Sequence, residues 1–231
     1  MSTIGGGVNI VTDGLVLYLD AANTKSYPGS GTAWSDLSRS GNNGVLTNGP
    51  TFNSGNGGSI VFDGTNDYAQ TTSNPIANDS SFTLETWVNF TNFNNSLFRP
   101  IIDCGNLGVG SLGYCLAKNT SNNLYLAINT GFVGISNTIT NNIWYHIVAT
   151  ASKTANYTMS IYLNSVLGTV NASAITSVLT NSQTSIRLMS NYVGTVLYSQ
   201  GNIGITRIYN KALTPQEIQQ NYNATKSRYG L

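Results

Sequence analysis

The chain has 231 residues, a length that suits one β-sandwich domain with a sizeable core. Only 8% of the residues are charged, against about 25% in an average soluble domain, and the formal net charge is +1. Its few lysines and arginines are scattered, so the sequence offers no positive field for nucleic acid or anionic lipid. With 40% hydrophobic residues and almost no net charge, it also lacks the composition of a disordered chain.

Residues 1–13 contain Gly5-Gly6-Gly7 and little to bury. We expect an N-terminal arm that is ordered only against a neighbouring subunit, followed by one domain over residues 14–231. No basic region followed by an apolar stretch is visible here, so we expect synthesis in the cytoplasm without a secretory signal. The longest apolar run, residues 15–19, is too short for membrane insertion.

Short runs of strand-forming residues recur from residue 15 onward, separated by Asn- and Gly-rich turns. Residues 23–50 are mostly turn residues, with Trp34 and Leu37 expected to pin them to the core. The predicted strands are residues 15–19, 60–63, 82–90, 100–104, 113–117, 124–128, 144–150, 157–164, 166–170, 185–189 and 203–209. This pattern, without an internal repeat or linker, predicts one antiparallel sandwich of two sheets.

The C-terminal residues carry a dense helix-start signal after strand 203–209. Thr214 can cap the first amides, Pro215 occupies the first helical position, and Glu217 completes a capping box. One face of the following segment then carries Ile218, Tyr222, Thr225 and Tyr229. We therefore expect one short helix that lies as a C-terminal latch on the β-structure.

Residues 207–218 resemble the closing motif of laminin-G-like domains in the concanavalin A-like jelly-roll superfamily. Four further segments match in order, namely residues 58–68, 82–88, 144–150 and 159–164. The resemblance implies an all-β, concanavalin A-like antiparallel β-sandwich (jelly roll) with one short C-terminal helix. Residues 14–23 and 221–231 also resemble laminin-G-like proteins of tailed phages of aquatic bacteria, which implies a virion component.

The superfamily includes glycoside hydrolases, which generally need two carboxylates flanking the scissile bond. Glu85 and Glu217 are the two glutamates, and Glu217 is assigned to the capping box. No second acid follows Glu85 at strand spacing, so we expect a protein that is not an enzyme. His146 is the single histidine, so no second imidazole is present to build a metal or catalytic site with it. It is predicted to be structural.

Cys104 and Cys115 lie in neighbouring predicted strands joined by a glycine-rich loop. They either form a disulfide across a hairpin or remain two buried thiols. Cytoplasmic synthesis favours the reduced thiols.

Laminin-G-like and pentraxin-like domains often hold Ca²⁺ at a rim of the sandwich, so the resemblance implies Ca²⁺ as the candidate cofactor. Asp63, Asn66 and Asp67 cluster in one turn and offer the oxygen ligands that Ca²⁺ requires, with Asp20 and Asp103 as further donors. The alternative, which we favour, is that Asp63 and Asp67 only fold the turn by bonding their own backbone.

Carbohydrate binding would use an aromatic platform with polar groups around it. Glu85, Trp87 and Asn89 should share one face of the strand at residues 82–90 and are the candidate carbohydrate-binding residues. The alternative is that a crossing loop or the C-terminal helix covers Trp87.

The leading hypothesis is a non-enzymatic structural protein of a phage virion, made in the host cytoplasm. It would be a capsid decoration or tail- or fibre-associated protein that contacts other virion proteins, forms a homo-oligomer and holds host or environmental glycans. The alternative is an extracellular carbohydrate-binding lectin module of a secreted or adhesion protein.

Overall fold

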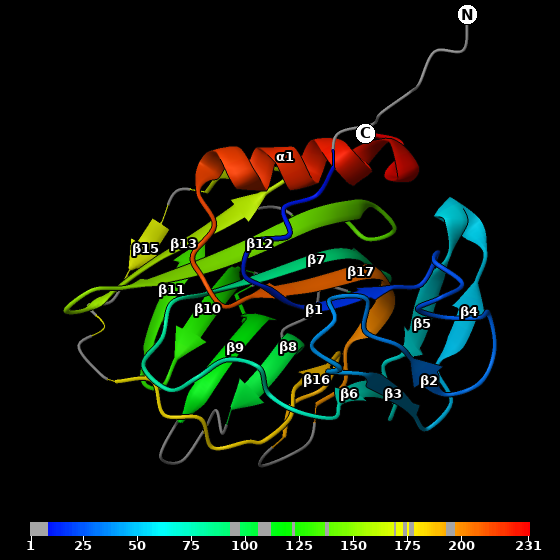
Figure 1. Cartoon of the computed structure of the whole chain (residues 1–231), viewed down its shortest axis with the longest axis horizontal. Helices are drawn as coiled ribbons and strands as arrows, with labels where there is room; N and C mark the ends of the chain where they lie inside the picture. Colours follow the sequence, from blue (N-terminus) through cyan, green and yellow to red (C-terminus); the bar gives the residue numbers. More distant parts are fainter. Residues whose placement is uncertain are drawn as a thin grey trace, which may run out of the picture.

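The computed structural model describes residues 9–92, 98–105, 112–121, 123–136, 139–168, 170–172, 175, 178–192 and 197–231. Two antiparallel sheets pack face to face, and one short α-helix, α1 (Pro215–Thr225), lies across the outer face of one of them (Figure 1). The predicted all-β sandwich with one C-terminal helix is confirmed. Within the described residues, no helix has the length and apolar character needed to cross a membrane.

The eight-stranded sheet has the order β14-β13-β12-β7-β17-β5-β4, and β1 pairs with β17. Its strands are β1 (Leu15–Asp20), β4 (Thr51–Asn53), β5 (Ser59–Asp63), β7 (Phe82–Phe90), β12 (Trp144–Lys153), β13 (Tyr157–Leu163), β14 (Val166–Leu167) and β17 (Gln200–Tyr209). Two 3₁₀ segments, η1 (Gly55–Gly57) and η2 (Lys226–Tyr229), accompany it, and η2 continues directly from α1.

The nine-stranded sheet has the order β15-β11-β10-β9-β8-β16-β6-β3-β2. Its strands are β2 (Ala33–Trp34), β3 (Gly44–Thr47), β6 (Tyr68–Thr71), β8 (Arg99–Gly105), β9 (Gly113–Lys118), β10 (Leu124–Ile128), β11 (Gly131–Ile135), β15 (Val170–Ala172) and β16 (Arg187–Leu188). The predicted strand at 185–189 is therefore reduced to two residues. Trp34 is fully buried, as expected for the residue that pins the long excursion before β3.

The predicted strand at residues 166–170 is instead two strands in different sheets. β14 extends the hairpin with β13, whereas β15 pairs with β11. The chain leaves the first sheet at Gly168, where an added Cβ would lie 2.6 Å from Ile135 Cγ2. Glycine allows this close passage without displacing the Ile135 side chain.

Strand β7 is buried along all nine of its residues. One face packs into the core between the sheets, with Phe82, Leu84, Val88 and Phe90. The other face carries Glu85, which lies directly opposite Arg207 of β17 in the strand register. The side chains of β7 alternate between two faces as predicted. Because α1 covers the outer face, neither face is exposed to solvent.

A buried polar network joins the eight-stranded sheet to α1. Glu85 Oε1 lies 2.7 Å from Arg207 Nη1 and 2.9 Å from His146 Nε2, and its Oε2 accepts a 2.7 Å bond from Asn221 Nδ2. Burial alone would raise the pKa of Glu85, but Arg207 and the bonds from His146 and Asn221 hold it at about 2. The carboxylate is therefore charged at neutral pH and ties three strands and the helix together.

The start of α1 has the predicted capping box. Thr214 Oγ1 accepts the N–H of Glu217, and the Glu217 carboxylate accepts the N–H of Thr214 at 2.8 Å. Farther along the helix, Asn221 Oδ1 accepts the Val11 N–H at 2.8 Å, and Gln220 donates to the carbonyl of Asn9 at 2.7 Å. Residues 9–13 of the predicted arm are thus held by their own chain, while residues 1–8 lie outside the described part.

Both cysteines are buried free thiols, which confirms the favoured interpretation. Cys104 packs in the core between the sheets. Cys115 lies opposite Asp103 in the β8–β9 register, on the outer face of the nine-stranded sheet. The two side chains point to opposite faces and do not meet across the hairpin.

Asp103, like Glu85, is a fully buried carboxyl group. Its Oδ2 accepts the N–H of Tyr192 at 3.1 Å, and its Oδ1 has no hydrogen-bond partner among the described residues. Burial raises the pKa of Asp103 to about 7, although the Cys115 thiol, backbone N–H groups and the Arg187 guanidinium act in the opposite direction.

Replacing Glu85 by alanine should lower the free energy of unfolding by about 3–5 kcal/mol, because Arg207 would stay buried without its carboxylate. Urea unfolding followed by tryptophan fluorescence measures the loss. Glu217→Ala is the control, since it removes the capping box and a partly exposed ion pair with Lys211 and should cost about 1 kcal/mol. Equal losses for the two variants would contradict a structural role for the buried network.

Replacing Asp103 by asparagine should change how stability depends on pH. The pKa of Asp103 is raised from its ordinary value of 3.8 to about 7 in the folded protein. The stability that the protonated Asp103 contributes is therefore fully present below pH 3.8 and is lost as the pH rises through about 7. Asp103→Asn should therefore raise the free energy of unfolding at pH 8 by about 2–4 kcal/mol and leave it nearly unchanged at pH 4.

Urea unfolding at several pH values tests this expectation, with the exposed Asp13→Asn as control. A pH profile identical in Asp103→Asn and in the unsubstituted protein would contradict it.

Candidate functional site

The predicted carbohydrate-binding residues share one face of β7, but that face is closed. Trp87 has no exposed surface, and its ring stacks on Tyr229 and Tyr222 with centroid distances of 4.1 and 5.8 Å. Glu85 is also fully buried, and Asn89 is 9% exposed. This arrangement agrees with the alternative interpretation, in which the C-terminal helix covers Trp87. The structure does not offer Glu85, Trp87 and Asn89 to a sugar.

The three residues predicted to hold Ca²⁺ lie together in the turn between β5 and β6. Asp63 Oδ1 accepts the N–H groups of Thr65 and Asn66 at 2.7 and 3.3 Å, and Asp67 Oδ2 accepts the N–H of Asp63 at 3.1 Å. The bond from Thr65 is the main reason that the pKa of Asp63 is lowered. These contacts are the ones expected if Asp63 and Asp67 fold the turn through their own backbone.

The two further oxygen donors considered for Ca²⁺ are engaged elsewhere. Asp20 pairs with Arg228 at 2.6 Å, and Asp103 is buried on the nine-stranded sheet. Over the described ranges of the chain, no three His, Cys, Asp or Glu side chains gather where they could hold a metal ion.

The outer face of the nine-stranded sheet lies on the side of the sandwich away from α1 (Figure 1). One row of side chains crosses this face from β3 to β11. In register order it contains Val45, Gln70, Arg187, Asp103, Cys115, Ala127 and Phe132. The middle of the row is buried, and both of its ends are accessible.

A groove of about 420 Å³ opens at the β3–β6 end of this face. Its lining consists of Val45, Thr47, Tyr68, Gln70, Thr71, Thr72, Thr184 and Ser185. None of these residues is acidic, and most offer a hydroxyl or an amide. A groove with an aromatic wall and several hydroxyl and amide groups is suited to a polar, uncharged or weakly charged ligand.

Arg187 is held in a clamp beside the groove. Its guanidinium carbon lies 4.5 Å from the ring centroid of Tyr68 and 4.4 Å from that of Tyr192. Arg187 Nε donates to Gln70 Oε1 at 3.2 Å, and Gln70 Nε2 donates to Ser185 Oγ at 3.2 Å. The Ser185 and Tyr192 hydroxyls lie 2.6 Å apart. The aromatic rings and the hydrogen bonds together fix the polar floor of the groove.

The opposite end of the same face carries a ridge of aromatic rings. Phe98 and Tyr125 have ring centroids 5.7 Å apart, and Tyr125 and Phe132 have centroids 6.4 Å apart. A small cleft of about 170 Å³ is lined by Asn119, Tyr125 and Phe132, and Phe132 is 49% exposed. The exposed face therefore has polar and aromatic groups at both ends.

The residues of the clamp are not marked in the sequence. Tyr68 closes a segment that matches the laminin-G-like pattern, but the bonds of Gln70 to Arg187 and Ser185 join residues more than a hundred positions apart. No local periodicity predicts that Arg187 and Tyr192 meet Tyr68.

Solved structures share this fold at low sequence identity. The binding domain of botulinum neurotoxin serotype D/C VPI 5993 matches with a TM-score of 0.71 and 16% identity, over 93% of this chain and 53% of that one. Trypanosoma rangeli sialidase, in complex with sialic acid, matches with a TM-score of 0.71 and 16% identity, over 99% of this chain and 36% of that one.

Domain 4 of AbnA, an extracellular GH43 arabinanase from Geobacillus stearothermophilus, in complex with arabinotriose, has a TM-score of 0.65 and 15% identity. That match covers 90% of this chain and 98% of the arabinanase domain. By contrast, the chain spans about half the length of the neurotoxin binding domain.

No curated protein sequence matches the chain. The family model of laminin-G-like domains, described as the concanavalin A-like lectin/glucanases superfamily, matches residues 63–219. Since this match covers more than half of the sequence and agrees with the two-sheet sandwich, the chain belongs to the concanavalin A-like lectin/glucanases superfamily.

Proposed function

We propose that this chain is a non-catalytic glycan-binding domain whose site is the groove beside the Arg187 clamp. The clamp is the observation that carries the proposal, because it fixes Tyr68, which lines an accessible groove, against the guanidinium of Arg187. Aromatic rings pack against the apolar faces of sugars, while amide, hydroxyl and guanidinium groups bond to the sugar hydroxyls. Gln70 and Ser185 supply such groups at the groove floor.

The similar structures support a glycan as the ligand class. One of them is of botulinum neurotoxin type C, and cell entry of that toxin is dependent upon interaction with two ganglioside molecules. The arabinanase domain was solved with arabinotriose. These are properties of those proteins, and they make a sugar the first ligand to test for this fold.

The absence of acids from the groove lining supports binding without hydrolysis. Glycoside hydrolysis generally requires an acid and a second carboxylate on either side of the scissile bond. Glu85 lies under α1, where its carboxylate forms hydrogen bonds with Arg207 and His146. Asp103 is buried beside the clamp and none of the residues lining the groove is acidic.

Substitution in the clamp should weaken glycan binding without unfolding the domain. We expect Tyr68→Ala and Arg187→Gln each to reduce the affinity for a glycan selected on an array by about tenfold or more, equivalent to about 1.4 kcal/mol. Isothermal titration calorimetry measures the affinity, and circular dichroism verifies the fold.

Arg39→Gln is the matched control, because it removes the same charge from another part of the surface and should leave glycan affinity unchanged. Flat binding across the array, or equal affinities for Arg187→Gln and Arg39→Gln, would contradict the assignment of the site.

We further propose that the domain works as a homo-oligomeric component of a phage virion, on the capsid or the tail. The proposal rests on the resemblance of residues 14–23 and 221–231 to phage proteins. One feature of the fold favours it: the C-terminus and residue 9 both lie on the α1 side, whereas the groove lies on the other sheet (Figure 1). Attachment through the α1 side would leave the groove accessible.

Mass spectrometry of purified particles and light scattering of the purified protein test the virion proposal. We expect the chain among the particle proteins and an oligomer in solution. A monomer that is absent from particles would favour an extracellular lectin module instead.

A further inference from the structure

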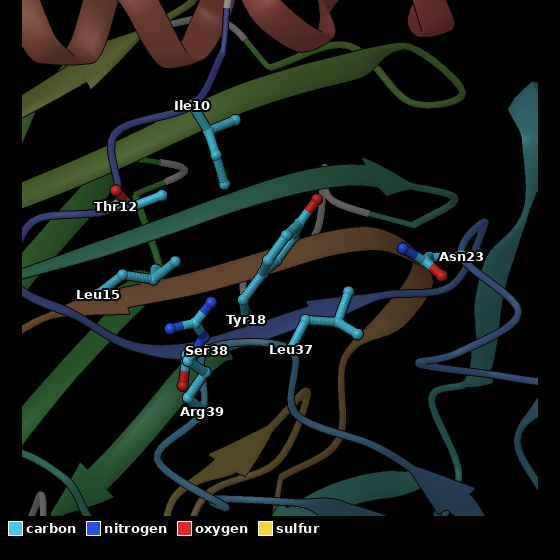
Figure 2. Close-up of a pocket in the computed structure, with 8 residues that line it drawn as sticks. All are labelled: Ile10, Thr12, Leu15, Tyr18, Asn23, Leu37, Ser38 and Arg39. Atoms are coloured by element: carbon cyan, nitrogen blue, oxygen red, sulfur yellow. The ribbon is translucent and has the colours of Figure 1, made fainter.

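A second cavity, of about 590 Å³, lies at the β1 edge of the eight-stranded sheet. It is lined by the N-terminal segment, by β1 and by the loop that contains residues 37–39 (Figure 2). Its lining consists of Ile10, Thr12, Leu15, Tyr18, Asn23, Leu37, Ser38 and Arg39. Its volume is within the range of small-molecule sites. None of its lining residues belongs to the groove of the nine-stranded sheet.

Hydrogen bonds hold the N-terminal wall of the cavity in place. The Val11 N–H donates to Asn221 Oδ1 at 2.8 Å, and the Val11 carbonyl accepts the Tyr209 hydroxyl at 3.1 Å. Val11 is buried, so its neighbours Ile10 and Thr12 are anchored to the same network that docks the helix. This wall is therefore formed before any ligand arrives.

The loop wall is fixed by one carboxylate. Asp36 Oδ1 accepts the N–H groups of Tyr18 and Ser38, both at 2.8 Å. Asp36 Oδ2 accepts the Ser38 hydroxyl at 2.8 Å and the Asn42 N–H at 3.0 Å. With four bonds to protein donors, Asp36 shapes the loop and is not among the residues that line the cavity. A preformed cavity loses little entropy when it binds a ligand.

The cavity combines apolar walls with unused hydrogen-bond donors. Arg39 has a positive φ of 76°, and Figure 2 shows its guanidinium turned toward Leu15 and Tyr18. Within the part of the chain that the structure describes, this guanidinium has no hydrogen-bond or ion-pair partner. Asn23 Oδ1 accepts the Lys25 N–H at 3.0 Å, which leaves the Asn23 amide nitrogen as a second donor.

Tyr18 forms the back of the cavity and is fixed on its inner side. The Arg207 guanidinium carbon lies 4.8 Å from the centroid of the Tyr18 ring, and the Tyr18 hydroxyl donates to Asp20 Oδ2 at 3.2 Å. Ile10, Leu15 and Leu37 supply apolar surface, and no lining residue is acidic. The cavity thus has free donors, one free positive charge and an apolar interior.

We propose that this cavity binds a small organic anion with an apolar body, of the class of medium-chain carboxylates. The carboxylate meets Arg39, and the hydrocarbon body packs against Ile10, Leu15 and Leu37. A guanidinium can bond a carboxylate through two parallel N–H groups, which selects this head group over an amide or an alcohol. The site is independent of the glycan groove.

Titration of the full chain with octanoate tests the proposal, with octanamide as the uncharged ligand of matched size. We expect saturable octanoate binding with a Kd of about 1 mM or lower. Calorimetry measures the affinity, and NMR shifts of the Leu15 and Leu37 methyl groups locate the ligand. Octanamide should bind at least fivefold more weakly. Arg39→Gln should weaken octanoate binding at least fivefold, whereas the matched Arg187→Gln should leave it unchanged.

Three results would overturn the proposal. The first is no saturable binding of octanoate at 10 mM. The second is equal affinity for octanoate and octanamide, or for Arg39→Gln and the unsubstituted chain, because either would remove the role of the charge. The third is a set of NMR shifts confined to the Phe132 cleft. The glycan proposal is tested independently of this one, through the glycan affinities of Tyr68→Ala and Arg187→Gln.

Discussion

The Glu85–Arg207 ion pair is the interaction on which the docking of the C-terminal helix depends. A buried pair of this kind gives little net stability over apolar side chains of equal volume, but an unmatched member is costly. Asn221 completes the pair from α1 and also accepts the Val11 N–H. We infer that the pair selects one position for the helix and for residues 9–13, because a shifted helix would leave Glu85 with an unpaired oxygen.

This docking decides which surfaces remain for a ligand. The helix and η2 seal the outer face of the eight-stranded sheet, where Trp87 is stacked between tyrosines. The outer face of the nine-stranded sheet keeps its groove and aromatic ridge, and the cavity at β1 forms where the sealed face ends. The extent of α1 therefore limits the cavity of the eight-stranded sheet to its β1 edge, and the groove lies on the sheet that α1 does not cover.

The sequence predicted the elements whose signals are local. Strand β7 and the capping box of α1 follow from alternation and from short-range side-chain chemistry. The short strands β2, β3, β4, β6 and β11 were not predicted, because neighbouring strands rather than their own residues define them. The same limit applies to the site: alternation shows that Trp87 and Glu85 share a face, but not that residues more than a hundred positions later cover it. The clamp of Arg187 likewise arises only from the sheet order.

The low charge content makes the remaining charges informative. Lys211, Arg207 and Arg228 are paired with acids in the fold, so their fields are largely cancelled. Arg187 is sandwiched between tyrosine rings, and Arg39 has no described partner. On a surface with few competing charges, a guanidinium that forms no ion pair and lies beside a cavity attracts an anion. The sparse charge of this chain therefore increases the selectivity that Arg39 can provide.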